Sequence, residues 1–249
     1  YTGDLNKKEV SHPDFQVKER SNIDVEAILK QQPSIDWRTK GVVNPIKNQG
    51  RCGSCWAFSA TSSVESLWAM AGNPLLDLSE QQLVDCSWDY GNMGCNGGLK
   101  TQAWLYVKTV GGQELQTDYP YTAQDQSCNF VKSKINASIK GYIQLDEHDC
   151  AGLLQSTTQS PVGVSVAVVP AFQAYSSGVF SITNCGTGIN HAINVVGYGT
   201  DSTTNQNYWI VRNSWGTSWG EQGYIRMDRD VQMPDGLCAI CDRVGYPLI

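Results

Sequence analysis

The stretch of sequence that decides the fold is Gln49-Gly50-Arg51-Cys52-Gly53-Ser54-Cys55-Trp56-Ala57-Phe58. Apolar residues recur at helical spacing after Ser54, and the helix predicted from them begins at Cys55. We expect the side chain of Ser54 to cap this helix. Because the backbone N–H groups and the dipole at a helix N-terminus favour an anion, Cys55 is predicted to be a thiolate nucleophile.

Two further motifs lie far downstream of this stretch. One is Ile189-Asn190-His191-Ala192-Ile193-Asn194, and the other is Asn213-Ser214-Trp215-Gly216. A Cys-Gly-Ser-Cys-Trp run followed at long distance by a histidine and an asparagine is a local signature of the papain-like cysteine peptidases. The chain resembles this family from about Pro33 to its end. Within the family, residues 78–86 are most similar to the cathepsin L branch.

The composition is that of a globular protein. The chain has 249 residues, of which 41% are apolar and 10% aromatic, enough for one large or two medium cores. Its formal net charge of -6 argues against nucleic acid as a partner, because an acidic surface repels a polyanion. No run reaches the ~18 apolar residues that a membrane span requires. Residues 1–4 lack the pattern of a signal peptide. We expect a monomer that binds neither membranes nor nucleic acid, with any signal peptide removed or left out.

The number of cysteines indicates an oxidising environment. Nine cysteines fit a secreted, lysosomal or vacuolar protein in which eight are paired and the nucleophile is free. The resemblance implies three disulfides, and elimination alone leaves Cys150 and Cys241 for a fourth. The three implied pairs are Cys52 with Cys95, Cys86 with Cys128, and Cys185 with Cys238. Passage through the secretory pathway also suits Asn136-Ala137-Ser138, which is an N-glycosylation acceptor.

The chain divides into three stretches. Residues 1–32 are highly charged and lack cysteine and tryptophan. They resemble the downstream end of the family's inhibitory pro-segment, whereas Pro33 and the residues after it resemble the start of the mature enzyme. We therefore expect a partly processed proform. Whether residues 1–32 cover the active-site cleft in the reversed direction, as the family's pro-segment does, or form a flexible tail is left open by the sequence.

Helical signals dominate from Cys55 to about residue 110, and strand signals dominate from about residue 140 onward. We therefore expect a mainly helical domain over residues 33–140 and a mainly β domain over residues 141–249. Ser79 and Gln82 form a capping box that predicts a helix start, while short β-branched or aromatic runs predict four strands. The runs are 162–169, 192–198, 208–212 and 223–227. This order predicts an α+β fold. The resemblance implies its papain-like form: a helical N-terminal domain that carries the nucleophile, an antiparallel β-barrel-like C-terminal domain that carries His191 and Asn213, and a cleft between them. The chain ends are free to cross from one domain to the other.

Hydrolysis of a peptide bond needs a nucleophile, a proton carrier and a stabiliser of the oxyanion. Cys55 is the predicted nucleophile. His191 is the predicted base by its motif, and because His12 lies in the pro-like stretch and His148 in a charged one. As imidazolium, His191 would hold Cys55 as a thiolate and would later protonate the leaving amine.

The resemblance implies roles for further residues around this pair. Asn213 would accept or donate a hydrogen bond at the far imidazole nitrogen and so orient the ring. Gln49 would offer its side-chain N–H, together with the backbone N–H of Cys55, to the oxyanion. Trp215 would shield the imidazole hydrogen bond from water, and Trp219 would offer an apolar face on the leaving-group side. None of these roles requires a metal or a cofactor.

The substrate is expected to lie extended and to pair through its backbone. Gly97 and Gly98 have no side chain to block it, and the resemblance adds the backbone carbonyl of Asn190. The resemblance also implies a pocket for the second residue upstream of the cut, and a count from Cys238 without gaps places Arg243 at its floor. This cation would accept acidic or polar side chains and repel basic ones, while Leu99 and Ile189 would still favour apolar groups. The alternative is that Arg243 is neutralised by Asp242 or points to solvent. The other residues of this pocket would be Leu99, Lys100, Ser165, Ile189 and Ala192.

The prediction is therefore a cysteine endopeptidase that acts on polypeptides through an acyl-enzyme, with its own pro-segment and cystatin-like protein inhibitors as further partners. No histidine lies between Cys55 and His148, so the occluding loop of the exopeptidase relatives is not expected. The main alternative is a catalytically silent papain-fold protein for binding or storage. A redox pair at residues 52–55 lacks a βαβ context, and a zinc site using residues 238–241 would need long-range assembly, so both are disfavoured.

Overall fold

The computed structural model describes residues 2–4, 15–18, 23–186 and 188–249, and His12 is among the residues outside the described part. The described helices are α1 (Val25–Gln31), α2 (Cys55–Met70), α3 (Glu80–Cys86), α4 (Lys100–Val110), α5 (Cys150–Gln159) and α6 (Pro170–Gln173). The described strands are β1 (Phe15–Lys18), β2 (Ile35–Asp36), β3 (Gln113–Glu114), β4 (Ile135–Ala137), β5 (Gly141–Leu145), β6 (Val162–Val166), β7 (Val179–Phe180), β8 (His191–Thr200), β9 (Asn207–Arg212), β10 (Tyr224–Asp228) and β11 (Gly245–Leu248). Across these ranges, no helix is long and apolar enough to cross a membrane.

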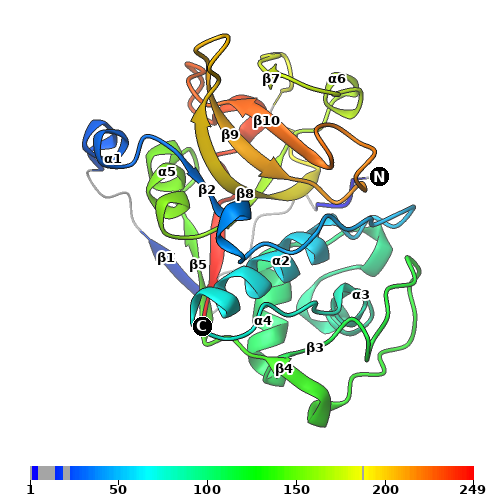
Figure 1. Ribbon diagram of the computed structural model, residues 1–249. Coiled ribbons are helices and arrows are strands. Elements are labelled where there is room, and N and C mark those ends of the chain that lie inside the picture. The colour runs from blue at the N-terminus through cyan, green and yellow to red at the C-terminus, as the bar shows by residue number, and fades with distance from the viewer. Residues whose placement is uncertain (1, 5–14, 19–22, 187) are drawn as a thin grey trace.

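The molecule has a helical half and a sheet half (Figure 1). Nine of the described strands form one sheet in the order β1-β5-β11-β6-β8-β9-β10-β7, with β2 paired to β8 off this path. The four strands predicted from sequence are β6, β8, β9 and β10, and neighbours among them pair antiparallel. The two outermost pairs, β1 with β5 and β7 with β10, are parallel. The antiparallel pairing predicted for this half therefore holds at its centre and not at its edges.

Helix α2 runs between the two halves (Figure 1) and begins at Cys55, as predicted. Its residues 55–66 are buried on every side, because α3 and α4 pack on one face and β6, β8 and β11 on the other. Ser54 stands at the N-cap position, but the predicted side-chain cap is wrong. The backbone of Ser54, at φ -102° and ψ 16°, is not extended as an N-cap usually is. Its hydroxyl lies 2.6 Å from that of Tyr121 instead.

Helix α3 begins where the capping box predicts, but only one of the two hydrogen bonds of that motif is formed. The hydroxyl of Ser79 accepts a hydrogen bond of 3.0 Å from the backbone N–H of Gln82. The side chain of Gln82 does not reach back to Ser79. It bonds to Tyr106 and Gly112, while the backbone N–H of Ser79 donates to the carbonyl of Glu114. Partners distant in sequence have thus replaced the reciprocal bond of the box.

One hydrophobic cluster fills each half of the molecule. The sheet-half cluster includes Phe172 and Ile193, and the helical-half cluster includes Trp56 and Trp104. The chain ends cross over: Ile35 belongs to the sheet-half cluster, and the C-terminal Ile249 packs against the helical one. A division at about residue 140 remains our proposal for the bulk of the two domains.

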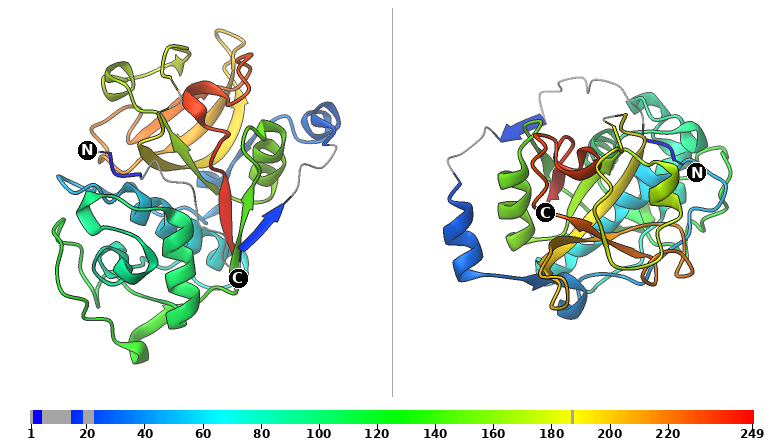
Figure 2. Two further views of the ribbon diagram at one scale, coloured as in Figure 1. Left: turned by 180° about the vertical axis from the view of Figure 1, so that it is seen from behind. Right: turned by 90° about the horizontal axis from the view of Figure 1, so that it is seen from above.

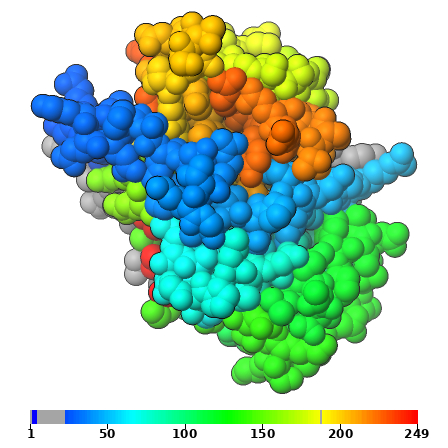
Figure 3. Space-filling view, in the orientation of Figure 1, coloured from blue at the N-terminus to red at the C-terminus, as the bar shows by residue number. Residues whose placement is uncertain are grey.

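The described parts of residues 1–32 contact the body of the protein at three places. Strand β1 pairs with β5 at the edge of the sheet. Helix α1 contacts α5, and Val25, Ile28 and Leu29 pack against the sheet-half cluster. In the space-filling view this helix and the residues that follow it lie along the surface of the sheet half (Figure 3). Residues 2–4 lie between the two halves (Figure 2). These described parts are packed against the protein and do not extend into solvent.

All the cysteines lie in the described part of the chain, where eight form disulfides and Cys55 is free. The pairs are Cys52–Cys95, Cys86–Cys128, Cys150–Cys241 and Cys185–Cys238. They are the three implied by the resemblance and the one left by elimination. Cys238 and Cys241 form separate disulfides, each with a cysteine outside their C-x-x-C run. Cys52 of the other C-x-x-C run also forms a disulfide, with Cys95. Neither a redox pair nor a zinc site fits this arrangement.

Candidate active site

The sulfur of Cys55 lies where α2 meets β8. The side chain is fully buried, and the backbone N–H of Ala192 donates to its Sγ over 3.4 Å. Since Ala192 follows His191 at the start of β8, this contact brings the predicted nucleophile and the predicted base together from opposite halves.

The imidazole of His191 is oriented by Asn213, whose Oδ1 lies 2.8 Å from Nε2. The same oxygen accepts a hydrogen bond of 2.8 Å from the backbone N–H of Ser214. Because a backbone N–H can only donate, it fixes the amide with its oxygen toward the ring, and Nε2 must then carry the proton. Asn213 therefore accepts. The lone pair of the neutral ring is left on Nδ1, which is buried and has no hydrogen-bond partner among the described residues.

Aromatic side chains cover the far side of this pair. The ring of Trp215 lies 4.7 Å from that of His191, centroid to centroid. Trp219 packs edge-on against Trp215 at 5.1 Å and stacks on Phe172 at 5.6 Å. Both tryptophans are half-buried. This packing is what a shield around the hydrogen bond between His191 and Asn213 requires, because water would otherwise compete for it.

Gln49 is fully buried, and its amide is held at both ends. The hydroxyl of Ser214 donates to Oε1 over 2.7 Å, and Nε2 donates to the carbonyl of Cys52 over 2.9 Å. The backbone N–H of Gln49 donates to the carbonyl of Ser214. An amide nitrogen carries two hydrogens, and Cys52 takes one of them. These bonds hold Nε2 on the side of the turn that leads into Cys55.

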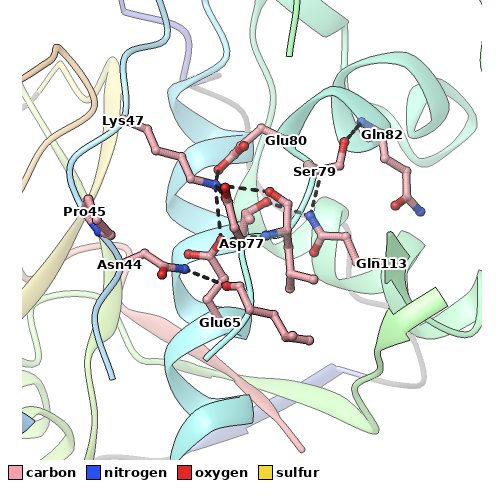
Figure 4. Close-up of polar contacts among 12 residues, drawn as sticks. Asn44, Pro45, Lys47, Glu65, Asp77, Ser79, Glu80, Gln82 and Gln113 are labelled. Atoms are coloured by element: carbon pink, nitrogen blue, oxygen red, sulfur yellow. Dashed lines mark hydrogen bonds and ion pairs between the residues drawn. The ribbon is translucent and has the colours of Figure 1, made fainter. Parts of the chain in front are cut away.

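The chain just before Gln49 is anchored by a buried cluster of charges (Figure 4). The ammonium group of Lys47 lies 3.2 Å from Glu65, 2.6 Å from Asp77 and 2.7 Å from Glu80. The carboxylate side chains of Glu65 and Glu80 are almost fully buried. Burial raises the pKa of Glu80 to about 7, against the opposing charge of Lys47. The cluster ties this segment to α2 and α3 and so supports the position of Gln49 two residues later.

The ionisation of Cys55 in this structure differs from the predicted thiolate. Burial, with the carboxylate of Asp4 as the second cause, raises the pKa of Cys55 to about 12, although backbone N–H groups that point to the sulfur oppose the rise. Burial likewise lowers the pKa of His191 to about 4. A buried pair excluded from water favours its neutral forms. These shifts favour a thiol and a neutral imidazole while the site is closed to water, and the thiolate and imidazolium expected from the local sequence stay a prediction for the open site.

Residues 2–4 occupy the backbone groups expected to bind substrate. The backbone N–H of Gly98 donates to the carbonyl of Gly3 over 2.8 Å, and that of Asp4 donates to the carbonyl of Asn190 over 3.0 Å. The approach is close, since a Cβ on Gly3 would overlap the carbonyl oxygen of Gly53. Gly98 has its own steric requirement, because a Cβ there would lie 2.5 Å from the indole of Trp56. Gly97 adopts a φ of 115°, which favours glycine.

The side chain of Asp4 enters the place predicted for the second upstream substrate residue. Arg243 Nη1 lies 3.8 Å from its Oδ1. Lys100 Nζ donates to Ser165 Oγ over 2.7 Å, and both are buried beside the carboxyl. Arg243 is neither neutralised by Asp242 nor directed to solvent: its side chain is only 14% exposed, and Asp242 lies 2.8 Å from His148. The predicted apolar members of this pocket are also buried, namely Leu99, Ile189 and Ala192.

Sequence analysis missed three residues of this site, which are Gly3, Asp4 and Ser214. Ser214 could have been considered, because it follows Asn213 directly and carries a hydroxyl that can hold a neighbouring amide. The sequence contains no local signal for the two N-terminal residues. Their partners are Gly98, Asn190 and Arg243, which lie far away along the chain.

The fold and these contacts define a site of the cysteine-peptidase class, with the nucleophile on a helix and the base on a facing strand. The chain belongs to the papain family of cysteine proteases, because the profile described as Papain family cysteine protease matches residues 31–248.

The chain is similar to several plant and animal proteases. It is 47% identical over 218 residues to Cysteine protease 1 of Oryza sativa subsp. japonica, a match that covers 86% of this chain and 44% of that protein. It is 47% identical over 219 residues to vignain of Vigna mungo, covering 86% and 59%. The chain thus spans about half the length of these relatives.

Two solved structures share the fold. The bromelain protease from Ananas comosus, in complex with the E64 inhibitor, has a TM-score of 0.82 and 40% identity, covering 88% of this chain and 99% of its own. Digestive procathepsin L 3 of the Tenebrio molitor larval midgut also has a TM-score of 0.82 and 40% identity, covering 88% and 70%. Together with the family profile, they identify the architecture as the papain-like α+β fold.

Proposed function

We propose that this protein is a cysteine endopeptidase of the cathepsin L branch, held here in an inhibited, partly processed form. The observation that carries the proposal is the contact of Cys55 Sγ with the strand of His191, whose far nitrogen is bonded to Asn213. This arrangement contains the nucleophile, the base and the orienting residue that the reaction needs.

The proposed reaction begins when Nδ1 of His191 takes the proton of the Cys55 thiol. The thiolate attacks the carbonyl carbon of the scissile bond, and the backbone N–H of Cys55 and the amide of Gln49 stabilise the oxyanion. The imidazolium then gives its proton to the leaving amine, and an acyl-enzyme remains on the sulfur. A water molecule deprotonated by His191 releases the acid and restores the thiol. Asn213 keeps the proton on Nε2 throughout.

Residues 2–4 support the inhibited form. They bond to Gly98 and Asn190 and bury the sulfur of Cys55. The backbone N–H of Gly3 is one of the groups directed at that sulfur. If the side chain of Asp4 marks the pocket for the second upstream residue, the segment runs opposite to a substrate. It would therefore block the site without being cut, and maturation near Pro33 would remove it.

The proposal extends to the cellular location of the protein, its glycosylation and its partners. Passage through the secretory pathway to a lysosome, a vacuole or the exterior suits the four disulfides of the described chain. Asn136 is exposed and accessible to glycosylation. Polypeptides are the proposed substrates, cystatin-like proteins are proposed inhibitors, and the protein is proposed to act as a monomer.

The test uses the full chain under mild reduction at acidic pH with a thiol-directed epoxide peptidomimetic. Mass spectrometry locates the adduct, and hydrolysis of a fluorogenic peptide is followed in parallel, with Cys55→Ser as the control. Labelling at Cys55 that appears only after residues 1–32 are clipped, with a matching loss of activity, supports the proposal. If clipped protein neither labels nor cleaves, the catalytic function is rejected in favour of a binding or storage role.

A further inference from the structure

The turn that leads into Cys55, residues 49–54, is held at both ends by one side chain from a distant part of the chain. The hydroxyl of Tyr121 donates to the backbone carbonyl of Gln49 over 2.8 Å, and its oxygen lies 2.6 Å from Oγ of Ser54. Because a carbonyl oxygen can only accept, the single hydrogen of the Tyr121 hydroxyl goes to Gln49. The hydroxyl of Ser54 must then donate to Tyr121. One phenol thus bridges the first and the last residue of the turn.

Both ends of this turn supply groups that the proposed reaction uses. Gln49 offers its side-chain amide to the oxyanion, and the residue after Ser54 offers the backbone N–H of Cys55. Ser214 holds the side chain of Gln49 through Oε1. Tyr121 adds a bond to the main chain of Gln49 and another to the residue that precedes Cys55. Its hydroxyl therefore acts on the supports of both oxyanion donors.

Tyr121 is itself fixed by the helical half of the molecule. Its ring packs edge-on against Phe58 of α2, with 4.9 Å between the ring centroids. The next residue, Thr122, donates its backbone N–H over 2.8 Å to the side chain of Gln81, a fully buried residue of α3. Nε2 of Gln81 donates to the carbonyl of Gln124 over 2.7 Å. The position of the phenol is thus set by α2 and α3, and not by the turn that it contacts.

Both partners of the Tyr121 hydroxyl are buried. Gln49 and Ser54 have no exposed surface, so water does not readily replace the phenol. Removing one partner of a buried hydrogen bond leaves the other unsatisfied at a cost in free energy, which a shift of the backbone relieves. Burial raises the pKa of Tyr121 to about 12, so the hydroxyl keeps its hydrogen at acidic and neutral pH.

We propose that Tyr121 is a positioning residue for the oxyanion, whose hydroxyl fixes the turn so that the amide of Gln49 and the backbone N–H of Cys55 converge on one point. This inference rests on the proposed peptidase function and adds a residue to it. Such donors act within about 2.7–3.1 Å of the oxyanion, and removing one lowers kcat by about 10²–10³-fold. A displaced donor loses part of this effect. We expect Tyr121→Phe to lower kcat by about 10-fold, with KM within about 2-fold of wild type.

The competing role for Tyr121 is to stabilise the fold without any part in the reaction. Two reagents for the sulfur of Cys55 separate these roles. A peptide aldehyde adds the sulfur to its carbonyl carbon, and the oxygen of the resulting hemithioacetal takes the place of the oxyanion. Methyl methanethiosulfonate forms no oxyanion: the thiolate attacks its methylthio sulfur, methanesulfinate leaves, and a mixed disulfide remains. A structural role predicts equal effects on the two reactions.

The experiment uses full-length protein processed after about residue 32, with active sites counted by epoxide titration so that only folded, competent molecules are compared. Tyr121→Phe should weaken inhibition by the aldehyde about 10-fold and leave the rate of methanethiosulfonate modification, measured after removal of the reductant, within about 2-fold of wild type. Tyr106→Phe is the matched control, because its hydroxyl also lies in the helical half and bonds to Gln82 instead. It should change neither reaction. Equal losses with both reagents, or no loss with the aldehyde, overturn the proposal.

Two further variants keep the test decisive. Ser54→Ala removes the bond at one end of the turn and should weaken the aldehyde by about 3-fold. It carries the comparison if Tyr121→Phe yields no active sites, and wild-type affinity for the aldehyde would then overturn the proposal. In Gln49→Ala one donor is already absent, so adding Tyr121→Phe should have a smaller effect than in wild type. Losses that multiply in full would overturn it as well.

Failure of the peptidase function itself has a different signature. A processed wild-type protein that neither cleaves peptides nor binds the aldehyde rejects that function, whereas an active wild type with an unaffected Tyr121→Phe variant rejects only the role of Tyr121.

Discussion

The sulfur of Cys55 accepts a hydrogen bond of 3.4 Å from the backbone N–H of Ala192, 137 positions away in the chain. One residue belongs to the buried helix α2 and the other to the strand that presents His191. The reactivity of the thiol therefore depends on how the two halves pack and on what lies between them. In this structure the intervening group is the chain's own N-terminal segment.

Removal of residues 1–32 is expected to make Cys55 more acidic. In the full chain its pKa is raised to about 12 by burial and by Asp4, so the thiol stays protonated at neutral pH. Processing admits water and removes the carboxylate, and both changes favour the thiolate. The rate of alkylation by iodoacetamide, measured from pH 4 to 10, should rise by about tenfold or more at pH 7. Identical pH profiles before and after processing would contradict this account.

Gly3→Val is expected to release the segment from the site. A Cβ at this position would overlap the carbonyl oxygen of Gly53, so the segment cannot seat as it does here. Epoxide labelling of the unprocessed chain should then become about as fast as that of the processed one. Gly141→Val is the matched control, since a Cβ there meets nothing closer than 3.9 Å. Slow labelling of the Gly3 variant would show that residues 2–4 do not limit access.

Asn213→Ala is expected to lower kcat of the processed enzyme by about 10²-fold with a smaller change in KM. The variant removes the acceptor that keeps the proton on Nε2 of His191, so the ring loses its orientation toward the sulfur. Steady-state kinetics with one peptide gives both constants. Asn129→Ala, at an exposed position, should match wild type. A change confined to KM would argue against an orienting role.

Lys47→Met is expected to destabilise the protein by about 3–5 kcal/mol at pH 8, because Glu65 and Glu80 lose their buried cation. The loss should shrink on acidification. Burial already raises the pKa of Glu80 to about 7, above its ordinary 4.5, so the folded state binds its proton more tightly than the unfolded state. The stabilisation that protonated Glu80 gives to the folded state is fully present below about pH 4.5 and is lost as the pH rises toward 7.

Urea unfolding at pH 4.5 and pH 8 measures this difference. Lys134→Met serves as the control, because its ion pair with Asp118 is on the surface and should contribute no more than about 1 kcal/mol. Equal losses for the two variants would mean that the Lys47 cluster is not effectively buried.

Local patterns predicted the elements of the fold better than the details of their ends. The helix at Cys55 and the four central strands follow from hydrophobic spacing, and the structure confirms them. The caps differ because distant groups compete with local ones: Tyr121 takes the hydroxyl of Ser54, and Tyr106 takes the side chain of Gln82. Such partners come from the tertiary structure and have no signature near the cap.

The motifs around Cys55, His191 and Asn213 led to the residues that the structure brings together, because each role admits few residue types. The sequence drew attention to Arg243 because of its charge, but it could not predict which residue forms an ion pair with Arg243. Asp4 and Arg243, which form this ion pair, lie 239 positions apart in the chain (243 minus 4). No periodicity or motif links them.

The sequence by itself determined the helix that carries the nucleophile, the order of the catalytic motifs, and a count of cysteines that leaves one unpaired. These properties depend on residue type and short-range spacing, which are the same in the unfolded and in the folded chain. Tertiary structure alone decided the ionisation of Cys55 and His191, the occupant of the substrate-binding backbone, and the surroundings of Arg243. Those properties depend on burial and on the electric field of nearby groups, and both arise only when distant segments are packed together.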